Sequence, residues 1–149
     1  MNSTRRRATA ALLALALSAP GTALAQGAEK FAARLAWVPT TGADRANVTG
    51  AGSVTATLTG RSLAITGTFD GLAAPATVAR LHDGIAKGAR GKPVADLTAT
   101  KAASGSLSGT VTLTPAQVES LKQGRLYVQL HSEKGVAPDG ATLWGWLLR

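Results

Sequence analysis

Hydrophobic and polar residues alternate one by one along most of the chain after residue 26. In residues 31–37, for example, Phe31, Ala33, Leu35 and Trp37 take every second position. Side chains of a β-strand point to alternate sides, so this pattern predicts strands that bury one face in an antiparallel sheet. Glycine, proline and polar residues separate the alternating segments and predict turns. We expect about eight strands, at residues 31–37, 54–59, 63–69, 77–82, 94–97, 107–113, 125–131 and 143–148.

One segment has a different pattern and predicts a short helix. Thr114 has the side chain of a helix N-cap, Pro115 suits the first helical position, and Gln117 completes a capping box. Gly124 suits the position just past the C-terminal end, so the helix should span residues 115–123. Eight strands with one short helix predict an all-β fold, for which we expect an antiparallel, Greek-key-like β-sandwich. We expect this sandwich to form a single domain over residues 26–149.

The first 25 residues have the pattern of a secretion signal. Three arginines at residues 5–7 precede an apolar, uncharged segment at residues 8–19. Ala23 and Ala25 then place small residues at the two positions that a signal peptidase reads. We expect Sec-type export, cleavage after Ala25, and a periplasmic or secreted product. No later segment is apolar enough to cross a membrane, so no span should remain after cleavage.

Composition excludes several kinds of chemistry. The chain has no cysteine, which excludes disulfides, cysteine-bound metals and thiol nucleophiles. Its formal net charge is +8, and loss of the three leader arginines leaves 13 basic against 8 acidic residues, or +5. That modest charge, together with export, argues against a nucleic-acid partner. There is no Gly-x-Ser-x-Gly turn and no closely spaced pair of carboxylates, so we do not expect an enzyme.

Several short motifs occur in an order that resembles a known family. Residues 81–84 read Leu-His-Asp-Gly, residues 91–94 read Gly-Lys-Pro-Val, and residues 126–131 read Leu-Tyr-Val-Gln-Leu-His. In this order, over residues 31–148, the chain resembles the CHRD domain of animal chordin and of secreted microbial proteins. The resemblance implies an extracytoplasmic β-sandwich with no established enzymatic reaction. Arg80 stands where the family pattern has a second histidine.

The two histidines are the candidate metal ligands. His82 and His131 are the only imidazoles, and both stand at the ends of predicted strands and at histidine positions of the CHRD pattern. If those strands are neighbours, the two rings and Asp83 could bind copper or zinc as a two-histidine, one-carboxylate site. The alternative is that each histidine hydrogen-bonds a loop carbonyl and fixes a connection. We favour that alternative, and expect no cofactor, because a stable metal site generally has three or four protein ligands.

The cations of residues 83–93 are candidates for anion binding. This segment combines three glycines with Lys87, Arg90 and Lys92, so backbone amides and positive charges could hold an anion together. The alternative is a solvated, flexible crossover loop that needs no ligand. We favour the loop.

Two tryptophans are candidates for a second ligand surface. Trp144 and Trp146 lie two residues apart and therefore on one face of the last predicted strand. If that face points outward, the indoles offer a platform for a glycan, a peptide or another subunit. If it points inward, they are core residues, which the apolar residues around them favour.

These observations predict an exported, CHRD-like binding or structural module without catalysis. Its expected partner is a protein, a glycan or a small anion of the cell envelope. The alternative function is a periplasmic protein that binds copper or zinc with His82 and His131.

Overall fold

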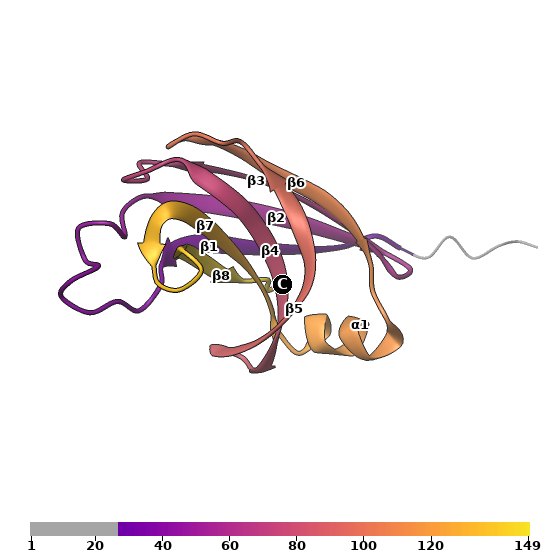
Figure 1. Ribbon diagram of the computed structural model, residues 1–149. Helices are drawn as coiled ribbons and strands as arrows, with labels where there is room; N and C mark the ends of the chain where they lie inside the picture. The colour runs from indigo at the N-terminus through magenta and orange to yellow at the C-terminus, as the bar shows by residue number, and fades with distance from the viewer. Residues whose placement is uncertain (1–26) are drawn as a thin grey trace, which may run out of the picture.

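The computed structural model describes residues 27–149, which form eight β-strands and one α-helix (Figure 1). The elements are β1 (Glu29–Trp37), β2 (Ala51–Thr59), β3 (Ser62–Asp70), β4 (Ala76–Ala86), β5 (Ala89–Ala99), β6 (Gly105–Thr112), α1 (Pro115–Lys122), β7 (Leu126–Val136) and β8 (Ala141–Trp146). All pairings between these strands are antiparallel, so the all-β prediction is confirmed. The predicted secretion signal and its cleavage point after Ala25 lie outside the described residues.

The strands form one closed barrel, and the expected sandwich is wrong. Around the barrel the order is β1-β2-β3-β6-β5-β4-β7-β8. The sheet closes where β8 pairs with β1, with Trp144 opposite Ala36, and a bridge between Ala32 and Leu148 extends the closure. Alternation shows that a strand buries one face, but it is the same in a sandwich and in a barrel. It therefore could not reveal that the first and last strands are hydrogen-bonded to each other.

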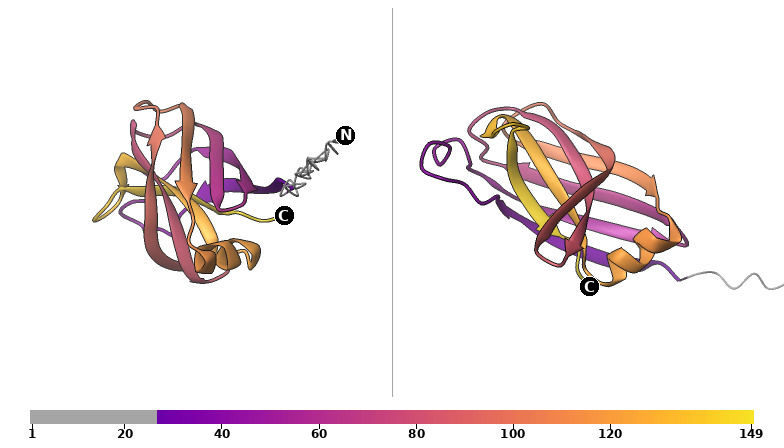
Figure 2. Two further views of the ribbon diagram at one scale, coloured as in Figure 1. Left: turned by 90° about the vertical axis from the view of Figure 1, so that its right-hand side faces the viewer. Right: turned by 60° about the horizontal axis from the view of Figure 1, so that its bottom comes forward.

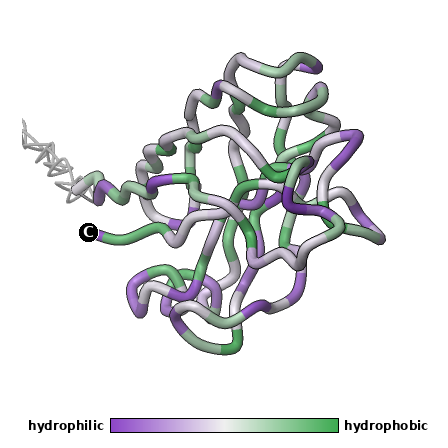
Figure 3. The backbone as a smooth tube through the Cα atoms, turned by 90° about the vertical axis from the view of Figure 1, so that its left-hand side faces the viewer, coloured by the Kyte–Doolittle hydropathy of each residue, from purple (hydrophilic) through white to green (hydrophobic). Residues whose placement is uncertain are grey.

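Aliphatic side chains fill the barrel. Alternate residues of each strand point inward, and hydrophobic and hydrophilic residues accordingly alternate along the backbone in Figure 3. The largest fully buried aliphatic residues are Leu63, Ile65, Leu81, Leu107, Leu113, Leu121, Leu126, Leu130, Leu143 and Leu147. These residues share one main core cluster. The C-terminus lies beside the start of β1 (Figure 2), where Arg149 forms an ion pair with Glu29.

The helix α1 forms as the sequence predicts. The Gln117 N–H donates to Thr114 Oγ1 over 3.2 Å, and the Thr114 N–H donates to Gln117 Oε1 over 2.9 Å, which completes the capping box. The helix ends one residue earlier than predicted, and Gly124, at φ +71°, follows its C-cap. Leu121 is buried in the barrel core, which fixes α1 against β4 and β7. In residues 27–149 no helix has the length and apolar composition needed to cross a bilayer.

The segment predicted as a flexible loop at residues 83–93 is instead the end of the β4–β5 hairpin. Lys87 and Gly88 form its two-residue turn. The two strands approach so closely that a Cβ at Gly91 would lie only 1.7 Å from the Asp83 carbonyl oxygen. Glycine permits this approach because it has no side chain. The glycines of residues 83–93 also interrupt the alternation of side chains that identifies a strand in the sequence.

Candidate functional site

The outer side of β4, β7 and β8 carries a row of stacked rings. The residues on either side of Tyr127 in β7 belong to the core, so Tyr127 points to the outside of the barrel. The strand register places His82 on one side of Tyr127 and Trp146 on the other. In both pairs the ring centroids are 4.8 Å apart, with interplanar angles of 16° and 29°. We call His82, Tyr127, Trp146 and the adjacent Trp144 the aromatic row.

The two tryptophans of this row lie outside the main core. Trp144 and Trp146 are half-buried, and their rings meet edge to face with centroids 4.7 Å apart. Leu143 and Leu147, which alternate with them, fill the barrel interior. The two indoles therefore point outward, and the expectation that they are core residues is wrong. The apolar residues around the indoles were misleading because they form the inner face of the same strand.

The end of the β4–β5 hairpin packs against the aromatic row. The Gly91 N–H donates to Tyr127 Oη over 3.2 Å. The guanidinium carbon of Arg90 lies 5.0 Å from the centre of the Trp144 ring, which is the geometry of a cation–π contact. These contacts explain why Tyr127 is only 1% exposed although it faces away from the core.

The hairpin does not present the backbone cradle that its glycines suggested. The N–H groups of Gly84 and Gly91 both donate to protein acceptors and are not available to an anion. The three cations also separate. Lys87 and Arg90 lie beside the two indoles, whereas Lys92 is exposed on β5.

His131 is held in a fixed tautomer by two hydrogen bonds. Its Nδ1 lies 3.0 Å from the Asp139 carbonyl oxygen, which can only accept, so Nδ1 donates. Its Nε2 then accepts from the side-chain amide of Gln129 over 3.3 Å. Burial lowers the pKa of His131, and the bond to Asp139 opposes that shift only in part. This is the loop-carbonyl contact that we expected as the alternative to metal binding.

His82 has a less polar environment. It is 8% exposed and stacks on Tyr127, and neither ring nitrogen makes a hydrogen bond of normal geometry within the described chain. Burial lowers the pKa of His82 by more than the neighbouring Gly91 backbone raises it. His82 is therefore a neutral ring in the aromatic row.

The side chain of Asp83 contacts Ser120 and Arg125 instead of the histidines. Its Oδ2 accepts from Ser120 Oγ over 3.1 Å, and its Oδ1 lies 3.5 Å from the Arg125 guanidinium, so it anchors the end of α1 to β4. Within residues 27–149, no group of three or more histidine, aspartate or glutamate side chains is arranged to hold a metal ion. The alternative hypothesis of a copper or zinc site at His82, His131 and Asp83 therefore has no support in the arrangement of these side chains.

A hollow of about 400 Å³ opens beside the aromatic row. It is lined by Arg34, Ala36, Lys87, Gly88, Trp144, Gly145, Trp146 and Leu148. Its charged residues are both cations, and Arg90 on Trp144 adds a third positive charge nearby. Arg34 has no signal in the sequence that links it to the indoles, because only the pairing of β8 with β1 brings it to them. We call this hollow the tryptophan hollow.

Comparison with known proteins places the fold in a family. The family model of the CHRD domain matches residues 31–141, which include both histidines and Tyr127. Searches among curated proteins and among solved structures gave no match. The two tryptophans lie after the matched segment. Because the match covers most of the sequence, the chain belongs to the CHRD domain family.

Proposed function

We propose that this chain is a non-catalytic binding module that works outside the cytoplasm, in the periplasm or after secretion. The CHRD domain is not a known enzyme family, which supports a binding or structural role. The location rests on the sequence of residues 1–25, with its basic start, apolar segment and small residues before the expected cut.

The binding role rests on one observation, the convergence of two indoles and three cations at the tryptophan hollow. Arg34 comes from β1, Lys87 from the hairpin turn and Arg90 from β5. Among residues 27–149, no carboxylate lines the hollow to neutralise them. Indole rings favour a flat apolar surface, and unpaired cations attract negative charge. The ligand is therefore an anion with a flat, apolar face.

The test uses 8-anilinonaphthalene-1-sulfonate, a flat aromatic anion whose fluorescence rises when it binds. We expect saturable binding to the purified protein. Trp144→Ala or Lys87→Glu should each weaken binding by about tenfold, or about 1.4 kcal/mol. Lys134→Glu removes an exposed cation of β7 that is not part of the hollow and is the matched control. Equal affinity in Trp144→Ala, Lys87→Glu and Lys134→Glu, with all three folded, would refute the site.

A further inference from the structure

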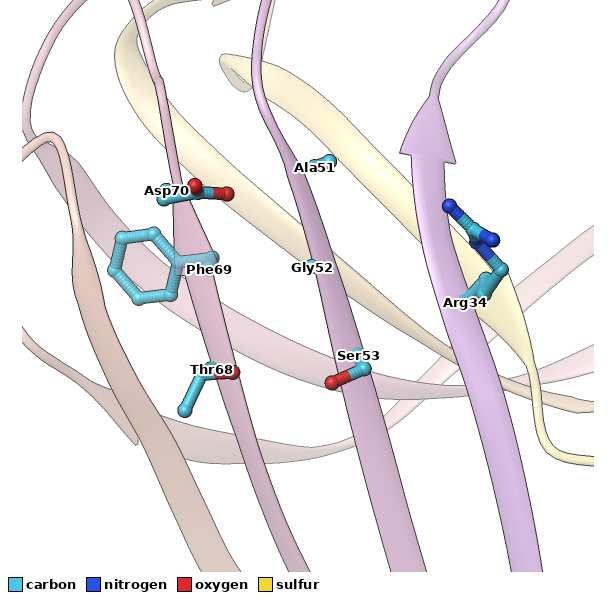
Figure 4. A pocket seen from close by; sticks show the side chains of 7 residues that line it. All are labelled: Arg34, Ala51, Gly52, Ser53, Thr68, Phe69 and Asp70. Atoms are coloured by element: carbon cyan, nitrogen blue, oxygen red, sulfur yellow. The ribbon is translucent and has the colours of Figure 1, made fainter.

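The tryptophan hollow and two neighbouring hollows lie in a row around the outside of the barrel, and we call this row the groove. The two neighbouring hollows have volumes of about 460 and 590 Å³, and all three are lined in part by Arg34. The middle hollow lies against Ala36, Trp37 and Ala51. The last lies over β2 and β3, where Figure 4 shows the side chains at its surface.

The groove runs across the strands. Trp144 of β8 is opposite Ala36 of β1, Arg34 of β1 is opposite Ser53 of β2, and Ser53 is opposite Thr68 of β3. The groove therefore crosses β8, β1, β2 and β3 in turn. Adjacent strands lie about 4.8 Å apart, so the two outer strands are separated by about 14 Å.

The chemistry changes along this groove. The first end has the indoles of Trp144 and Trp146. Trp37 lies beside the middle of the groove and is 58% exposed, and its Nε1–H donates to the Gly50 carbonyl oxygen over 2.8 Å. Arg34 occupies the middle, and within residues 27–149 it forms no ion pair. The far end offers the hydroxyls of Ser53 and Thr68 and the groove's one carboxylate, Asp70.

We propose that this groove binds a linear, carboxylate-bearing polysaccharide, with about three sugar rings lying across the four strands. The inference rests on the proposed function and names its ligand. The apolar faces of sugar rings stack on the half-buried indoles of the first end and on exposed Trp37, and a sugar carboxylate pairs with the free guanidinium of Arg34 in two parallel hydrogen bonds. Sugar hydroxyls pair with the hydroxyls and carboxylate of the far end.

The closed barrel also disfavours an extended peptide. An extended peptide gains much of its affinity by adding a strand to an open sheet edge. Along the groove no such edge is available, because β8 is paired with β1, β1 with β2 and β2 with β3. A ligand across the strands must therefore bind through side chains, which suits a sugar chain.

The first experiment measures affinity against chain length by calorimetry, with oligogalacturonates and oligomannuronates of one to six rings. We expect at least one series to gain about tenfold in affinity up to about three rings and then to level off. Neutral glucose oligomers of the same lengths should bind about tenfold more weakly. Affinity that does not depend on length, or absence of millimolar binding by both acidic series, would overturn the proposal. If dye binding still depends on Trp144 in that case, the proposed function stands and only the ligand assignment falls.

Variants then place the sugar chain in the groove. Ala51→Phe fills the exposed middle of the groove, so it should abolish the gain with length while dye binding in the tryptophan hollow persists. Ala64→Phe, at an exposed position of β3 outside the groove, is its control. Arg34→Gln should abolish the preference for acidic over neutral oligomers, whereas Arg61→Gln, at the exposed β2–β3 turn, should not. Retained length dependence in Ala51→Phe would overturn the proposal.

Discussion

Mild acid should destabilise the barrel through its two buried histidines. His82 and His131 are 8% and 0% exposed, and burial is the main reason that the pKa of each lies below the ordinary 6.5. Between pH 6.5 and the lowered pKa values, the unfolded chain therefore binds protons that the folded chain does not. The contribution of the two neutral histidines to the free energy of unfolding is fully present above pH 6.5, and it is lost as the pH falls from 6.5 toward the pKa values of the folded state.

The size of the effect follows from proton linkage. A histidine that is neutral when folded and has its ordinary pKa when unfolded lowers the free energy of unfolding by about 1.4 kcal/mol between pH 7.5 and pH 5.5. The two histidines together give up to about 2.8 kcal/mol, against a typical total of about 5–15 kcal/mol. Most carboxylates titrate below this range and contribute little. Urea unfolding followed by tryptophan fluorescence at the two pH values measures the difference.

A variant separates the histidines from other titrating groups. His82→Phe keeps an aromatic ring against Tyr127 and removes one imidazole, so the loss between pH 7.5 and pH 5.5 should become smaller, by up to about 1.4 kcal/mol. Glu133→Gln removes an exposed carboxylate of β7 and should leave the loss unchanged. The reasoning is refuted if the parent protein is equally stable at both pH values, or if His82→Phe loses as much stability as the parent.

Two further predictions concern the hairpin and the leader. Gly91→Ala would place a methyl group against the Asp83 carbonyl oxygen, so the hairpin end must move. We therefore expect the free energy of unfolding to fall by about 2 kcal/mol and the affinity for the dye to fall as well. Gly42→Ala is the control, because a Cβ there meets nothing within 4 Å, and it should change neither stability nor dye affinity. Equal urea midpoints for the two variants would contradict the close packing of Gly91 against Asp83. In a bacterial host, mass spectrometry should find an exported protein that begins at Gln26. Protein that stays in the cytoplasm and begins at Met1 would refute the secretion signal.

The separate elements of this fold could be predicted because each depends on local signals. The capping box of Thr114 and Gln117 involves residues three apart, and the alternation of each strand needs only a few consecutive residues. The β4–β5 hairpin end was mispredicted for the same reason. Its local signal is interrupted at glycines such as Gly91, whose role depends on a neighbouring strand.

The closed barrel and the candidate site depend on contacts between distant residues, and these had no local signal. Trp144 and Trp146 could be placed on one face, but which face depended on how β8 packs. Arg34 is more than a hundred positions from them in the chain and reaches them only because β8 pairs with β1. The same pairing excludes the sandwich that the strand pattern and the family resemblance had both suggested.

The aromatic row has a buried part and a half-buried part. His82 and Tyr127 lie within the matched residues 31–141, are buried, and support the β4–β5 hairpin end against β7. Trp144 and Trp146 lie beyond the match and are only half-buried. His82, one of the two histidines that invited a metal-binding interpretation, thus stacks on the same Tyr127 ring as Trp146. A family resemblance carried by the buried residues could predict strands and histidine positions. It could not predict a ligand, because Trp144 and Trp146 lie outside the matched segment and the exposed side chains of β1, β2 and β3 come together only across paired strands.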